Sequence, residues 1–164
     1  MKRNLFIIIA LSLVIFACGS KETSTTAQDY HSTLIAIQTD VDNAFVDLMD
    51  AIDNGDEADI LSTQEYAETV LADALKEIED IGKFDGTDEY KKEMIKLLSM
   101  YEDILENELA EIIDYTIYFD DLTDEEWEYY YSVNDSMMDK YEKAHEEFVE
   151  YQDAFSVKWE FALG

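Results

Sequence analysis

The sequence contains no proline and only five glycines among its 164 residues. Proline interrupts the hydrogen bonding of a helix interior, so its absence allows long, uninterrupted helices. Three of the glycines, Gly55, Gly82 and Gly86, fall between segments with helical periodicity, where a helix would end. The composition therefore favours a few long helices joined by short loops.

Basic residues are scarce, with 11 lysines and arginines against 40 aspartates and glutamates and a formal net charge of −29 at pH 7. A field of this sign repels phosphate groups, so the sequence excludes nucleic acid as a partner. High net charge also occurs in disordered chains, but here 48% of the residues are hydrophobic and 13% are aromatic. That is enough apolar surface to bury a core, so we expect one folded domain.

Motifs for enzymatic chemistry and for resident metals are also missing. The sequence has no glycine-rich phosphate loop and no Gly-x-Ser-x-Gly turn, and its single cysteine leaves no cysteine pair for zinc. The acidic run at 53–57 lacks the alternating ligands and the final glutamate of an EF-hand. We therefore predict a protein that is not an enzyme and that has no cofactor and no metal.

One fragment matches a cofactor motif, the Glu-x-x-His of di-iron helical bundles, at Glu142 and His145. Such sites need a second Glu-x-x-His and two further glutamates, yet the other histidine, His31, follows Gln28 at that spacing. The alternative hypothesis is a metal- or haem-handling bundle that uses His145 and acidic residues. A histidine at the edge of the core, bonded to a neighbour such as Tyr141, explains the same position.

Four segments have the apolar periodicity of amphipathic helices. They cover residues 29–53, 57–81, 87–119 and 123–159. Thr123 and Glu126 form a capping-box sequence at the start of the last segment. Four such helices with short loops predict an all-α fold, an antiparallel up-down four-helix bundle, and a three-helix layout with one short pair fused is the alternative.

The spacing of residues in the fourth segment predicts which of its faces points inward. This face comprises Trp127, Tyr131, Asn134, Met138, Tyr141, His145, Phe148, Gln152, Phe155 and Trp159. Its three polar members, Asn134, His145 and Gln152, would be buried and would fix the register of the helices.

The lone cysteine, Cys18, follows a basic and then apolar N-terminal stretch. Two basic residues precede an apolar run over 5–16, and the small residue Ala17 stands directly before the cysteine. Secretory signals have this order, and the run is shorter than the roughly 20 residues that a spanning helix needs. Ile15-Phe16-Ala17-Cys18 resembles the lipobox of bacterial lipoproteins, which implies that Cys18 is lipidated.

That resemblance divides the chain into a signal peptide, a lipidated cysteine with a flexible tether, and the bundle, at 1–17, 18–28 and 29–161. Gly19 in place of an aspartate favours an outer-membrane anchor, on either the periplasmic or the surface-exposed face. Together with the closing Phe148-x-x-x-Gln152-x-x-Phe155, these features resemble the small helical surface lipoproteins of two-membrane bacteria. The resemblance implies that the membrane is a partner through Cys18, and it carries over no catalytic residue.

In an up-down bundle with an N-terminal anchor, the first and third loops form a membrane-distal tip. Acidic and aromatic residues gather there, and residues 22–75 and 97–139 contain no lysine or arginine. We predict that this tip contacts a basic protein partner or divalent cations. Its predicted contact residues are Tyr118, Tyr129, Tyr130, Asp120, Asp121, Asp124 and Glu125. The competing interpretation is a solvated acidic surface whose aromatic residues close the end of the core.

Overall fold

The computed structural model describes residues 24–118 and 122–163, and every regular element within these ranges is a helix. The helices are α1 (Ser24–Asn54), α2 (Glu57–Asp80), α3 (Glu89–Glu106), α4 (Glu108–Tyr118) and α5 (Asp124–Trp159). The all-helical class predicted from the sequence is confirmed. The predicted signal peptide, Cys18, Asp120 and Asp121 lie outside the described residues.

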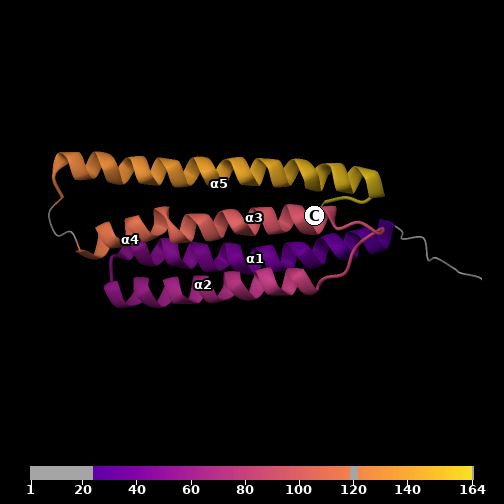
Figure 1. Ribbon diagram of the computed structural model, residues 1–164, viewed down its shortest axis with the longest axis horizontal. Helices are drawn as coiled ribbons and strands as arrows, with labels where there is room; N and C mark the ends of the chain where they lie inside the picture. Colours follow the sequence, from indigo (N-terminus) through magenta and orange to yellow (C-terminus); the bar gives the residue numbers. More distant parts are fainter. Residues whose placement is uncertain (1–23, 119–121, 164) are drawn as a thin grey trace, which may run out of the picture.

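The helices run up and down along one long axis, so that α1, α2, the α3–α4 pair and α5 alternate in direction (Figure 1). The third predicted helix is divided in two by Asn107, whose backbone leaves the helical region at φ −115° and ψ −82°. The Asn107 side chain bonds the Asp103 carbonyl oxygen at 2.8 Å, a local bond that competes with regular helix. Because α4 continues beyond α3 along the same axis, four rods pack together.

The first helix begins earlier than the sequence pattern predicts. The pattern predicts a start at about Asp29, after a flexible tether, but α1 begins at Ser24. Ala27, within the predicted tether, is completely buried and belongs to the core cluster. Residues 24–28 are therefore helical, and the burial of Ala27 in the core stabilises a segment whose polar sequence predicts a flexible tether.

The core consists of aliphatic and aromatic side chains from every helix, with Phe84 from the loop between α2 and α3. Its largest fully buried members are Tyr101, Leu34, Leu48, Ile60, Ile78, Met94, Leu97, Leu98, Leu109, Ile112 and Val41. Each large apolar side chain that is removed from water contributes roughly 1.5–3 kcal/mol to the free energy of folding. Burial of these side chains therefore holds the helices together.

The packing between the rods is uneven. α1 packs closely along α2, and α3 packs on both α2 and α5, whereas α1 and α5 meet over only a short length. The four-rod arrangement is consequently closed between three neighbouring pairs and open between α1 and α5.

The inward face of α5 differs from the prediction over the first half of the helix. Its buried residues are Val133, Met137, Phe148, Phe155 and Ser156. Four members of the predicted stripe, Trp127, Tyr131, Met138 and Tyr141, are instead between 37% and 58% exposed. The apolar residues of α5 cover two adjacent faces, and only one of them packs against α3 and α4. The predicted buried polar residues Asn134, His145 and Gln152 are half-buried.

The capping box at the start of α5 is confirmed. The Thr123 hydroxyl accepts a bond from the Glu126 backbone N–H, and the Thr123 N–H donates to the Glu126 carboxylate at 2.8 Å. The Thr123 N–H and hydroxyl both donate to the Glu126 carboxylate, and these two bonds lower the pKa of Glu126, because they favour its charged form.

We expect Thr123→Ala to lower the free energy of unfolding by about 1 kcal/mol, because it removes a side-chain cap from the helix start. Thr39→Ala is the matched control, since the Thr39 hydroxyl is exposed and bonds only a carbonyl oxygen within its own helix. Urea denaturation of both variants measures the difference. Equal effects of the two substitutions would show that the capping box adds nothing to stability.

Candidate functional site

An apolar groove, here called the α1–α5 groove, occupies the open side of the bundle. Its volume is about 270 Å³. The lining residues are Asp42, Phe45, Val46, Met49 and Asp50 of α1, Tyr101 and Ile104 of α3, Leu109 of α4, and Met137, Met138 and Tyr141 of α5. The buried residues Tyr101, Ile104 and Leu109 form the floor, while Val46 and Met138 are 58% and 43% exposed at the rim.

The groove exists because both walls carry apolar residues beside the stripe that faces the core. On α1, Phe45 is buried and the next residue, Val46, is exposed. On α5, Met137 is buried and Met138 is exposed in the same way. Residues four positions apart lie on one helix face, which extends the wall on α1 to Met49 and Asp50. These extra residues widen each apolar face beyond the width that the core covers.

The charges around the groove are acidic. Asp42 and Asp50 line it, and no basic side chain does so. Lys140 of α5 points to the other flank, where it pairs with Asp103 and with Glu108, the latter at 2.8 Å. A molecule in the groove would therefore meet an apolar floor and carboxylates on the α1 wall.

A polar cluster of Asp42, Tyr101 and His145 lies beside the groove. The Tyr101 hydroxyl donates to the Asp42 carboxylate, and its oxygen lies 2.8 Å from His145 Nε2. Because the hydroxyl has a single proton, which goes to Asp42, Nε2 of His145 is the donor in the second bond. The imidazole ring also packs on Tyr141, with 4.2 Å between the ring centroids. The cluster joins α1, α3 and α5 in one hydrogen-bonded chain.

The electrostatics of this cluster favour a neutral histidine. Burial lowers the pKa of His145, and the charge of Asp42 opposes this shift without reversing it. Burial and then the bond to Asp42 raise the pKa of Tyr101, which keeps the phenol protonated. Because its hydrogen bonds join α1, α3 and α5, the cluster positions the walls of the groove relative to its floor.

The structure brings only part of the predicted tip surface together. The Tyr129 hydroxyl donates to the Glu111 carboxylate at 2.8 Å, and its ring lies 5.9 Å from that of Tyr115. Tyr130 is half-buried and packs on the ring of Trp127, with 5.6 Å between centroids. These aromatic residues partly close the end of the core, and the role of the tip as a contact surface stays a prediction.

The acidic members of the predicted surface have a different position. Asp124 and Glu125 are exposed in the first turn of α5, where negative charge suits the positive end of the helix. Tyr118 is the last residue of α4. The exposed aromatic residues Trp127 and Tyr131 lie on the same face of α5 as Met138, because positions four and seven apart share a face of a helix.

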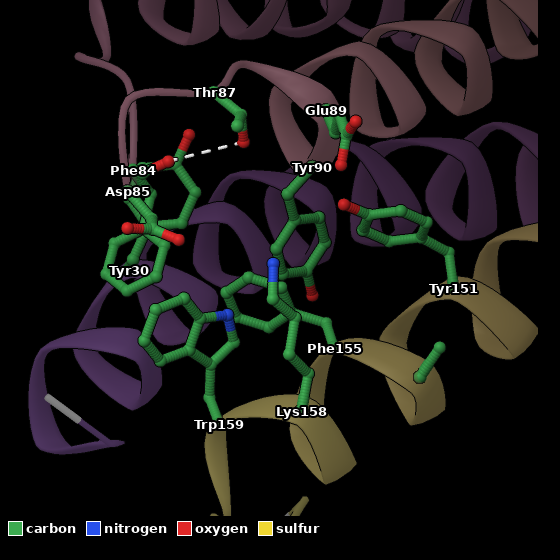
Figure 2. Close-up of a pocket in the computed structure, with 11 residues that line it drawn as sticks. Tyr30, Phe84, Asp85, Thr87, Glu89, Tyr90, Tyr151, Phe155, Lys158 and Trp159 are labelled. Atoms are coloured by element: carbon green, nitrogen blue, oxygen red, sulfur yellow. Dashed lines mark hydrogen bonds between the residues drawn. The ribbon is translucent and has the colours of Figure 1, made fainter. Parts of the chain in front are cut away.

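A second cavity, here called the aromatic pocket, lies at the opposite end of the molecule, where α1 begins and α5 ends (Figure 2). Its volume is about 140 Å³. The lining residues are Tyr30, Phe84, Asp85, Thr87, Glu89, Tyr90, Tyr151, Ala154, Phe155, Lys158 and Trp159. They come from α1, the loop before α3, the start of α3 and the last turns of α5.

A tight turn places one wall of the aromatic pocket. The backbone N–H groups of Phe84 and Thr87 bond each other's carbonyl oxygens at 3.1 and 3.0 Å. Asp85 and Gly86 between them both have positive φ, at 49° and 73°, which is the geometry of a type I′ turn. Asp-Gly is the usual sequence for this turn. The helical periodicity predicts Gly86 only as a residue between two helices, whereas the Asp-Gly pair is the local signal for the turn that holds Phe84.

Metal ligands do not converge at the histidines. Among residues 24–118 and 122–163, no group of three or more histidine, cysteine, aspartate or glutamate side chains could hold a metal ion. His145 contacts Tyr101 and Tyr141, and His31 contacts the hydroxyl of Tyr90. The hypothesis that His145 binds a metal or haem has no supporting observation in the described part of the chain.

We expect both histidines to titrate below pH 6.5 in the folded protein, because burial lowers the pKa of His31 and of His145 from that value. The unfolded chain then binds protons first, so each histidine reduces stability as the pH falls below 6.5. NMR titration of the two imidazole signals measures both pKa values, and His145→Gln assigns them.

The stability effect is measured as the difference between wild type and His145→Gln, since the many carboxylates contribute equally to both proteins. Wild type should lose stability relative to the variant as the pH falls from 7 to 5. A His145 pKa above 6.5, or a constant difference, would contradict the effect of burial.

None of the described helices has a stretch long and apolar enough to cross a membrane. No family model matches the chain, and neither a curated protein nor a solved structure matches it. The groove and the pocket are therefore the basis for assigning a function.

Proposed function

We propose that this chain is a non-enzymatic, lipid-anchored binding protein of the bacterial envelope. Its α1–α5 groove takes up a basic amphipathic helix from a partner protein. The observation that carries this proposal is the apolar groove on the open side of the bundle, bordered by carboxylates and by no basic side chain. Helical grooves of this kind bind helices that present one apolar stripe.

The shape and composition of the groove favour a helix as its occupant. The walls are two helices that meet over only a short length, and a partner helix lying along the groove would extend the packing between them. The rim contains Met49, Met138 and Tyr141. Methionine side chains adapt to irregular apolar partners, and tyrosine is enriched at protein interfaces.

Charge complementarity supports a basic partner. Asp42 and Asp50 line the groove in a chain whose net charge is −29. Lysine or arginine residues beside the apolar stripe of the partner would face these carboxylates. Such a field speeds the encounter of oppositely charged molecules and weakens as salt is added.

An exposed aromatic face of α5, which does not include the predicted contact residues Tyr129 and Tyr130, continues this site toward the tip. Trp127 and Tyr131 are exposed on the same face as Met138, between the groove and the end of the bundle. We therefore include this aromatic face in the proposed binding surface. The acidic residues Asp124 and Glu125 would contribute attraction at longer range.

The lipid anchor is proposed from the sequence pattern around Cys18. α1 begins shortly after this position, so an acyl chain on Cys18 would hold the α1 end of the bundle near the membrane. The loops at the other end of the bundle would then point away from the membrane, and the α1–α5 groove would be exposed along the side of the bundle. This arrangement makes the groove accessible to a partner, on either the periplasmic or the surface-exposed face of the outer membrane.

We expect growth with labelled palmitate to label the wild-type protein and not Cys18→Ser. Unlabelled wild-type protein would contradict lipidation, because Cys18 is the only cysteine in the chain. This test leaves the groove unaltered and is therefore independent of the binding proposal.

We expect the helical bundle, expressed without the predicted signal peptide and Cys18, to bind a fluorescent leucine/lysine amphipathic peptide of about 18 residues, which spans roughly five helical turns. Fluorescence polarisation should show saturable binding that weakens with salt. The leucine/glutamate peptide of the same pattern should not bind, because its charge has the sign of the groove.

A matched pair of variants locates the binding. Val46→Gln should weaken binding of the lysine peptide about tenfold, since loss of one buried aliphatic side chain costs about 1.5 kcal/mol. Leu61→Gln changes an exposed apolar residue of α2 outside the groove and should leave binding unaltered. Equal effects of the two variants would show that the groove is not the binding site.

A further inference from the structure

The aromatic pocket has the composition of a site for a small organic cation. Six aromatic rings line it: Tyr30, Phe84, Tyr90, Tyr151, Phe155 and Trp159. Neighbouring rings are in contact, with centroid distances of 4.9 Å between Phe84 and Trp159 and 5.3 Å between Tyr90 and Tyr151. The faces of such rings carry negative potential and attract cations, ammonium ions with methyl groups included.

The protein already places a cation of its own against this cluster. Lys158 lines the pocket, and its Nζ lies 5.3 Å from the centroid of the Trp159 ring. Figure 2 shows the Lys158 side chain extending from α5 toward Trp159 and Tyr90. Because Lys158 is exposed on the last turns of α5, its side chain can leave the ring for solvent when another cation takes its place.

Carboxylates add to the negative potential of the pocket. Asp85 and Glu89 line it, while Lys158 is the one basic residue among the lining side chains. Burial raises the pKa of Tyr151 to about 12, and the charges of Glu89 and Glu93 contribute to this shift. A negative field therefore acts on the interior of the pocket and favours a cationic ligand over a neutral one.

Trp159 offers a second point of recognition. Its Nε1 is a buried donor without a hydrogen-bond partner among the described residues. An unsatisfied buried donor is unfavourable, and an acceptor atom supplied by a ligand would satisfy it. A cationic ligand that also carries an acceptor oxygen would therefore fit the pocket better than one without it.

We propose that the aromatic pocket binds a small, free amino alcohol of choline type. Its ammonium group takes the place of Lys158 on the rings, and its hydroxyl oxygen accepts a bond from Trp159 Nε1. A cavity of about 150 Å³ holds a molecule the size of benzene, so a pocket of about 140 Å³ suits a ligand of choline size. Asp85 and Glu89 would repel the phosphate of a lipid headgroup, which favours the free molecule.

Titration with choline, followed through the indole N–H signals of the protein, tests this proposal. The chain has two tryptophans, and Trp127→Phe identifies the signal of Trp159. Choline should shift the Trp159 signal saturably and leave that of Trp127 unchanged. The neutral isostere 3,3-dimethylbutan-1-ol should bind at least about fivefold more weakly, since it lacks the charge that a cation–π contact requires. Phosphocholine should also bind more weakly than choline.

Two pairs of variants separate the pocket from general charge effects. Lys158→Met should tighten choline binding by about three- to fivefold, because it removes the competing cation. Lys143→Met makes the same change of net charge elsewhere on α5 and should not alter binding. Asp85→Asn should weaken binding, and asparagine tolerates the positive φ of this position. Asp135→Asn is its control on an exposed site of α5.

Several results would overturn the proposal. These are an unshifted Trp159 signal at tens of millimolar choline, equal binding of choline and the neutral isostere, and unchanged affinity in Lys158→Met. Phosphocholine binding as tightly as choline would assign the pocket to lipid headgroups instead. The result is independent of the α1–α5 groove, since the two cavities share no lining residue.

Discussion

The packing of α5 on α3 and α4 is the constraint on which both candidate sites depend. α5 is the longest helix, and its apolar residues cover two adjacent faces. A helix can turn only one face to its neighbours, so packing on α3 and α4 leaves Met137 and Phe148 buried and Met138 at the surface. The groove toward α1 follows from this geometry. At the C-terminal end of α5, the same packing brings Phe155 and Trp159 into contact with Phe84 and completes the aromatic pocket.

The helices could be predicted from the sequence because their apolar periodicity and end signals agree. The capping box at Thr123 correctly predicts the start of α5, and Gly55 correctly predicts the end of α1. Other features depend on packing that periodicity does not contain. The early start of α1 depends on the burial of Ala27, and the inward face of α5 depends on which of two apolar faces meets α3. The break at Asn107 is a local competition between side chain and backbone.

The candidate sites were less predictable than the fold, since each joins residues that are distant in the sequence. The Tyr101 hydroxyl meets Asp42 across 59 positions and His145 across 44. The Glu-x-x-His spacing drew attention to His145 for a metal, whereas its contacts are with two tyrosines. The aromatic pocket had one local signal, the Asp-Gly pair at 85–86, which indicates a tight turn and hence the position of Phe84.

The break at Asn107 has a consequence for the width of the groove. Tyr101 and Ile104 come before the break and Leu109 follows it, so the floor of the groove rests on two helices that can change their mutual angle. Interruptions within a helix often act as hinges. A small rotation about Asn107 would move Leu109 and the α4 end of α5 relative to α1. Such a rotation would change the width of the groove at the α4 end of the bundle, while α1, α2 and α3 kept their packing.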